Sequence, residues 1–194
     1  VHERGLTGKG VVIGVLDTGF APESLSALDG ADILARHDFV DGDDNPFETP
    51  EHGTATLSCI AAFEPGTLIG TAWEASFLLG RTEIVDREIH LEEDLWAAGI
   101  EWMERQGVDI VSSSLGYSQF DDGSTLVLDG VSSAITLSAS ADVERGVFVV
   151  NSAGNSGFSG VDAPADGYNV CSVGAVDSAS HIASFSSRGP TVDG

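Results

Sequence analysis

Apolar and β-branched residues occur in short, nearly continuous runs, separated by longer stretches that mix polar and apolar positions. Such runs are typical of strands that are buried on both faces, since a half-exposed strand would alternate polar and apolar residues. The expected strands cover residues 10–16, 76–80, 109–111, 146–150 and 170–176.

Three of the intervening segments have the length and composition of helices, namely residues 52–63, 91–106 and 131–145. The second carries the clearest signals, because acidic residues 92–94 fill its first turn, where the helix dipole favours anions. Trp96, Ile100 and Met103 recur on one face, and Gly107 marks the end. The alternation of strands and helices predicts an α/β domain with a mainly parallel sheet.

The charge balance excludes two classes of partner. The 194 residues contain 31 Asp and Glu but only 8 Lys and Arg, which gives a formal net charge of −23. We therefore expect binding neither to nucleic acid nor to an anionic membrane surface. No apolar run approaches the roughly 18 residues that a membrane-spanning helix needs. The acidic residues are spread along the chain, which fits either a hydrated surface in concentrated salt, as in halophiles, or an ordinary acidic secreted protein.

Cysteines and acidic loops give little sign of a metal site. Cys59 and Cys171 are too few and too far apart for a disulfide framework or a zinc site of the usual spacing, so both are expected to be buried thiols. The turn-rich segment 38–51 is predicted to be a surface loop. Its residues 41–45 carry oxygen ligands that could suit calcium, but the spacing is not that of an EF-hand, and a solvated loop is the preferred interpretation.

Candidate chemistry lies just after the predicted strands, because functional groups of parallel α/β sheets collect at the carboxyl ends of the strands. Asp17 follows the first strand, and His52 opens the first helix 35 residues later. Ser114 follows the third strand, and Asn155 lies in the small-residue loop after the fourth. Each residue alone has an ordinary explanation as a helix cap or turn former. Together they could form most of a nucleophilic site, in which a carboxylate orients an imidazole base and an amide stabilises an oxyanion.

Five motifs carry a family resemblance in order and spacing. They are Asp17-Thr18-Gly19, His52-Gly53-Thr54, the stretch from Gly99 to Gly116, Ala153-Gly154-Asn155, and the stretch from Val173 to Pro190. From about Gly8 to its last residue the chain resembles the subtilisin-like serine proteases. The resemblance implies a three-layer α/β sandwich with a mainly parallel central sheet, secretion with a pro-segment, and hydrolysis of polypeptide substrates. It requires no cofactor, although family members often bind structural calcium.

The resemblance also implies roles for individual residues. Asp17 would be the orienting acid, His52 the general base and Asn155 the side-chain oxyanion donor. The two edges of the substrate cleft would be formed by Ser114, Leu115, Gly116, Ala153 and Gly154. Small residues there would leave room for a large apolar substrate side chain. Pro164 lies where the family often has a proline, sometimes in the cis form.

One departure from the family pattern concerns the nucleophile. The family serine lies in a Gly-Thr-Ser motif, whereas the Gly-Thr pairs of this chain are followed by Ala55, Leu68 and Ala72. Ser186 and Ser187 belong to a structural segment of the family and are no substitute. We therefore expect residues 1–194 to be a partial peptidase domain that lacks the nucleophile and is inactive alone. The sheet face left uncovered predicts either poor stability or self-association.

Three other interpretations were weighed. Asp17-Thr18-Gly19 also matches the aspartic-protease motif, but that site needs two copies and an all-β fold. Gly8 and Gly10 precede the first strand, whereas a dinucleotide-binding loop follows it. A non-catalytic protease-like domain that binds peptides or acts as a scaffold stays open, since only a downstream Gly-Thr-Ser segment would exclude it.

Overall fold

The computed structural model describes residues 2–47 and 51–191 and is built around one six-stranded sheet in which every neighbouring pair of strands is parallel. The strand order is β2-β5-β1-β6-β7-β8. The strands are β1 (Val12–Asp17), β2 (Asp32–Asp38), β5 (Ser76–Arg81), β6 (Ile110–Ser113), β7 (Phe148–Ser152) and β8 (Cys171–Val173). The predicted α/β class is confirmed.

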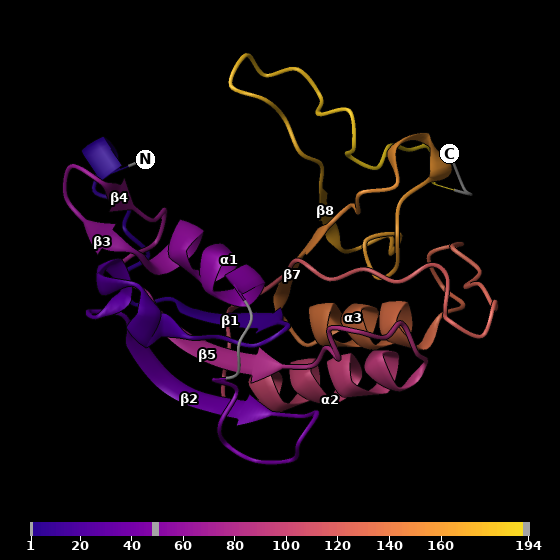
Figure 1. Cartoon of the computed structure of the whole chain (residues 1–194), viewed down its shortest axis with the longest axis horizontal. Coiled ribbons are helices and arrows are strands. Elements are labelled where there is room, and N and C mark those ends of the chain that lie inside the picture. Colours follow the sequence, from indigo (N-terminus) through magenta and orange to yellow (C-terminus); the bar gives the residue numbers. More distant parts are fainter. Residues whose placement is uncertain (1, 48–50, 192–194) are drawn as a thin grey trace.

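Helices cover both faces of this sheet and make a three-layer sandwich (Figure 1). Helix α1 (Glu51–Ala61) packs on one face, where Leu57 joins a core cluster of eleven buried residues. Helices α2 (Leu91–Arg105) and α3 (Ala134–Glu144) pack on the other face, where Trp96 belongs to the second cluster. Burial on both sides explains why the central strands are nearly continuous apolar runs.

Five of the six sheet strands match the predicted runs, whereas β2 was not predicted. It lies at one edge of the sheet, and its side chains alternate between exposed and partly buried positions until the buried Asp38. An apolar run is therefore not required there. The small hairpin of β3 (Phe63–Glu64) and β4 (Leu68–Ile69) was also not predicted, since two-residue strands carry no periodic signal.

Two further expectations need correction. Cys59 is exposed on α1, and Cys171 is only partly buried at the start of the edge strand β8, so the prediction of two buried thiols is wrong. Helix α3 begins at Ala134 and not at residue 131 as expected, because the Ser133 hydroxyl accepts a hydrogen bond from the Thr136 backbone N–H and caps the helix.

Short 3-10 turns make up the other helical elements, namely η1 (His2–Arg4), η2 (Pro22–Ser24), η3 (Ser26–Leu28) and η4 (Gly157–Ser159).

The predicted surface loop 38–51 is anchored at its start. Asp38 is buried and accepts a hydrogen bond from Arg81, which also bonds Asp41. Asp44 also contacts His37, at 2.8 Å. Two of the acidic side chains in residues 41–45 therefore already have partners within the protein. Residues 48–50 of this segment lie outside the described part of the chain.

The strand order fixes where a site can form. β1 occupies the middle of the sheet, and the chain places β5 on one side of it and β6 on the other. At such a switch point the loops after neighbouring strands diverge and leave a crevice at the carboxyl edge of the sheet. Asp17 ends β1 at this edge, and Arg81 and Ser113 end its two neighbours.

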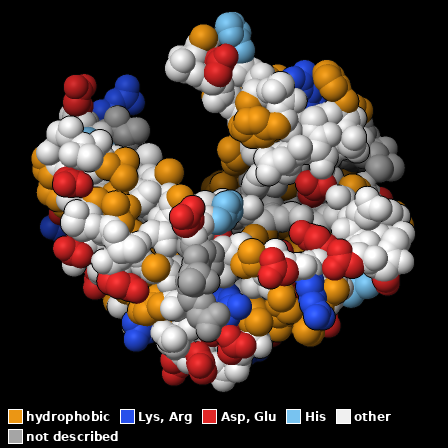
Figure 2. Space-filling view, in the orientation of Figure 1, with side chains coloured by type: hydrophobic (Ala, Val, Ile, Leu, Met, Phe, Trp, Pro, Cys, Tyr) orange, Lys and Arg blue, Asp and Glu red, His pale blue; other side chains and the backbone are white. Residues whose placement is uncertain are grey.

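The surface is acidic, and one part of it beside β8 exposes several apolar side chains. Acidic side chains spread across the face shown in Figure 2, which is also deeply hollowed. Beside β8, a segment that extends away from the body in Figure 1 exposes the side chains of Val173, Val176, Ile182 and Phe185, here called the β8 apolar surface. None of the described helices combines the length and hydropathy needed to cross a membrane.

Candidate active site

The centre of the site is a hydrogen bond between Asp17 and His52. His52 Nδ1 lies 2.6 Å from Asp17 Oδ1, and the carboxylate side chain is fully buried while the imidazole is half exposed. Asp17 Oδ1 also accepts hydrogen bonds from the backbone N–H and the hydroxyl of Thr18, and Oδ2 accepts one from the Thr56 hydroxyl. The carboxylate is thus held in one orientation and presents one oxygen to the imidazole.

This arrangement changes the proton affinity of the imidazole. The hydrogen bond and the charge of Asp17 raise the pKa of His52 above its usual value, against a smaller lowering by burial, and the charge of Glu83 raises it further. Nδ1 faces the carboxylate, so Nε2 is the ring nitrogen available on the exposed side. A half-exposed imidazole oriented in this way can accept a proton at Nε2 and return it.

Helix α1 holds His52 in place through a close backbone approach at Gly53. A Cβ atom on residue 53 would lie 1.9 Å from the carbonyl oxygen of Gly19 and 3.2 Å from Cβ of Asp17. Only glycine therefore allows the start of α1 to pack against the turn after β1, which sets the distance between His52 and Asp17.

We expect Gly53→Ala to lower the free energy of unfolding by about 1–3 kcal/mol through this contact, although alanine is intrinsically the better helix former by about 1 kcal/mol. Urea denaturation followed by circular dichroism measures the change. Ala55→Ser, at an exposed position of the same helix, should stay within about 0.5 kcal/mol of the original protein. An unchanged stability of the Gly53 variant would show that the turn moves freely away from the helix.

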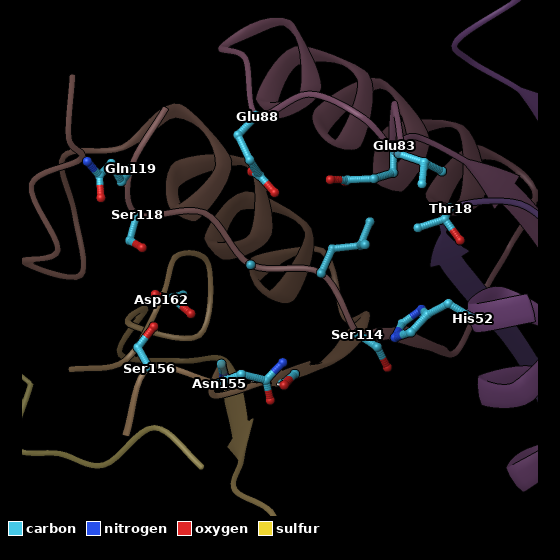
Figure 3. Close-up of a pocket in the computed structure, with 15 residues that line it drawn as sticks. Thr18, His52, Glu83, Glu88, Ser114, Ser118, Gln119, Asn155, Ser156 and Asp162 are labelled. Carbon is cyan, nitrogen blue, oxygen red and sulfur yellow. Dashed lines mark hydrogen bonds between the residues drawn. The ribbon is translucent and has the colours of Figure 1, made fainter. Parts of the chain in front are cut away.

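His52 opens onto a cavity of about 500 Å³ (Figure 3). Its walls carry four of the five residues predicted to form the cleft edges together with the predicted oxyanion donor, namely Ser114, Leu115, Gly116, Gly154 and Asn155. In Figure 3, Ser114 and Asn155 lie along one side of the cavity with His52. Ala153 is buried behind this wall and does not line the cavity.

Non-local contacts fix the two cavity edges relative to each other. The buried Asn151 amide donates to the Leu115 carbonyl at 2.8 Å, and an antiparallel bridge joins Tyr117 to Ala163. The Ala163–Pro164 peptide bond is cis, one of the forms expected at Pro164. The cleft edges are therefore held by the sheet and by the loop after β7.

Several polar residues of the site were not predicted from the sequence. Thr18 and Thr56 orient Asp17, and Thr56 could have been found because it lies one helical turn after His52 on the same helix. Glu83, Glu88 and Asp162 line the cavity but belong to loops that no motif singled out.

Glu83 is the most perturbed carboxyl group of the cavity. Its side chain is buried and lies 2.5 Å from the Tyr117 hydroxyl. Burial raises its pKa to about 8, assisted by the charges of Glu92 and Glu88 and opposed by the Tyr117 hydrogen bond. Glu83 is therefore expected to be largely protonated at neutral pH.

This shift predicts a pH-dependent stability. The folded protein holds a proton on Glu83 that the unfolded chain releases near its ordinary pKa of 4.5. The contribution of Glu83 to the free energy of unfolding is therefore fully present below about pH 4.5 and falls as the pH rises toward about 8. Glu83→Gln should flatten the fall, measured as the difference in urea midpoint between pH 5 and pH 8. Parallel pH profiles for the two proteins would contradict the assignment.

Among the described residues, one group of carboxylates is close enough to share a metal ion. Glu83, Glu88 and Glu92 each place an oxygen within 4.8 Å of the others. Glu92, however, already accepts hydrogen bonds from the backbone N–H groups of Ile84 and Ile89. We assign no metal site to this group.

The fold and the geometry of the Asp17–His52 pair can now be compared with known proteins. A family profile described as Peptidase_S8, subtilase family, matches residues 8–194. The chain belongs to the subtilase family.

Known proteins similar to this chain agree with that membership. Subtilisin BL from Lederbergia lenta is 31% identical over 193 residues, which cover 99% of this chain and 65% of that protein. Subtilisin DY from Bacillus licheniformis is 32% identical over 200 residues, with coverages of 100% and 66%. The chain thus spans just under two thirds of the length of these relatives.

Solved structures support the same fold. The structure of the prenylagaramide maturation protease PagA superimposes with a TM-score of 0.72 at 22% identity and covers 93% of this chain and 58% of that one. The self-cleaved protease domain of PatA gives a TM-score of 0.73 at 23% identity, with coverages of 94% and 64%. These likenesses establish the subtilisin-like architecture of the chain.

Proposed function

We propose that the full-length protein is a serine endopeptidase of the subtilisin type. The observation that carries this proposal is the 2.6 Å contact between His52 and the buried carboxylate of Asp17. The other side of the His52 ring opens onto the cleft, which Asn155 also lines. Membership of the subtilase family supports it. The similar proteins with protease names are longer than this chain, so the activity is proposed for the full-length protein.

In the proposed mechanism, His52 Nε2 takes the proton from a serine hydroxyl as that oxygen attacks the scissile carbonyl carbon. Asp17 keeps the proton of Nδ1 in place and stabilises the imidazolium that forms. The Asn155 amide donates a hydrogen bond to the developing oxyanion. His52 then gives its proton to the departing amine, and water hydrolyses the acyl-enzyme by the same route.

The serine would come from a part of the full-length protein outside residues 1–194. The chain contains no Gly-Thr-Ser sequence. Ser114 lines the cavity, but it lies on the segment that we assign to the substrate backbone. Residues 114–116 and 154–155 would hold a substrate as an added strand between them, which places its scissile carbonyl near His52 and Asn155.

A serine-directed phosphonate tests the assignment. The full-length protein should form one covalent adduct, and peptide mass spectrometry should locate it on a serine beyond residue 194. The unfolded protein in urea serves as the control and should not react, because an unactivated hydroxyl is a poor nucleophile. An adduct on Ser114 would overturn the role of that segment. The absence of any adduct in the folded protein would favour the alternative, a non-catalytic domain that binds peptides.

The proposal also covers the substrates, cofactors and location of the full-length protein. We propose that its substrates are polypeptides, that catalysis needs no cofactor, and that it is exported with a pro-segment, as the family resemblance implies. The acidic surface is compatible with work in concentrated salt. For the isolated chain, we propose self-association through the β8 apolar surface.

A further inference from the structure

A nearly buried carboxylate lines the proposed substrate cleft. Asp162 lines the cavity and is only 8% exposed. Its backbone N–H donates to the Ala153 carbonyl at 3.1 Å, and the next residue, Ala163, is bridged to Tyr117. The backbone that carries Asp162 is therefore fixed to both edges of the cleft.

Two glycines make room for this side chain. A Cβ atom on Gly154 would lie 1.9 Å from Asp162 Oδ2, and one on Gly116 would lie 3.1 Å from Asp162 Cβ. The Asp162 side chain can therefore pack against the backbone of both cleft edges. In Figure 3, Asp162 lies between Ser118 and Ser156, away from His52.

The carboxylate lacks a cation within the protein. Among the described residues, no lysine or arginine lines the cavity, and Asp162 takes part in no ion pair with either. Besides His52, the charged residues of the lining are Glu83, Glu88 and Asp162. Burial raises the pKa of Asp162, and the Ser118 hydroxyl opposes this only in part. A buried carboxylate without a cation is destabilised, and a cationic ligand would relieve this.

We infer that Asp162 is a specificity-determining residue and binds the positively charged Lys or Arg side chain of a substrate at the residue before the scissile bond. This inference rests on the proposed function. The small residues of the cleft edges suggested room for a large apolar side chain, but an aspartate lines that space. The aliphatic stem of lysine or arginine would lie along Leu115 and the glycines, with its charge at Asp162.

Peptide substrates that differ only before the scissile bond test this in the full-length protein. Lysine should be preferred over norleucine, which has a similar chain without the charge, by about 100-fold in kcat/KM. Asp162→Asn should remove most of that preference, measured as the ratio of the two kcat/KM values within the same variant. Asp29→Asn, at an exposed position outside the cavity, should leave both rates unchanged. Equal rates for lysine and norleucine would overturn the inference.

A binding measurement separates this inference from the proposed activity. Benzamidinium should bind to the full-length protein, as followed by calorimetry, whereas the neutral analogue benzamide should not. Asp162→Asn should weaken benzamidinium binding at least 10-fold, and its circular dichroism should show that it is folded. Binding that depends on Asp162 in a protein without hydrolysis would refute the activity alone. Hydrolysis without such binding would refute the cation site alone.

Discussion

Replacement of His52 by alanine in the full-length protein is expected to lower kcat for peptide hydrolysis by about 10⁴-fold or more, with little change in KM. The reason is the geometry at Asp17, which leaves His52 Nε2 as the ring nitrogen that faces the cleft. Without the imidazole no positioned base takes the proton from the attacking hydroxyl. Residual activity above that of water would come from Asn155 and substrate binding.

The measurement is steady-state hydrolysis of a chromogenic peptide, together with the rate of phosphonate labelling, which should fall in parallel. His2→Ala is a suitable control, because His2 is exposed and lies outside the cavity. It should keep the original kcat. A His52 variant that retained more than about one tenth of the activity would place the general base elsewhere and remove the basis of the proposed function.

Replacement of Asp17 by asparagine is expected to lower kcat by about 10⁴-fold, since an amide no longer holds the imidazole in the productive tautomer. It should also lower the pKa of His52, because the hydrogen bond to Asp17 is the largest cause of the raised value. The base must be unprotonated to act, so the rising limb of the pH profile should move to lower pH in the variant.

The two effects can be measured separately. The pKa of His52 follows from the pH dependence of its imidazole resonances by NMR, which needs no turnover. Glu23→Gln, at an exposed position outside the cavity lining, controls for the loss of one negative charge. A fall in kcat with an unchanged His52 pKa would contradict the electrostatic role assigned to Asp17.

The sequence predicted well those features that are encoded locally. The strands that are covered on both faces appear as apolar runs. Asp17 and His52, which the structure brings into contact, were singled out because each directly adjoins a predicted element. Edge strand β2 was missed because its partly exposed residues carry no such run. Asp162 was missed for another reason: its place in the cleft depends on the bridge between Tyr117 and Ala163, a contact between distant segments.

The central position of β1 has a consequence for how the site comes apart. β1 is paired along both edges and covered on both faces, whereas β8 pairs with the described residues along one edge only. Amide hydrogens of β1 should therefore exchange with solvent only through global unfolding, and those of β8 through local opening. Asp17 lies in the last part of the molecule to open, while Asn155 lies in the loop after β7, the partner of β8. Asp17 would thus keep its place under mild denaturing conditions that already disorder the oxyanion donor.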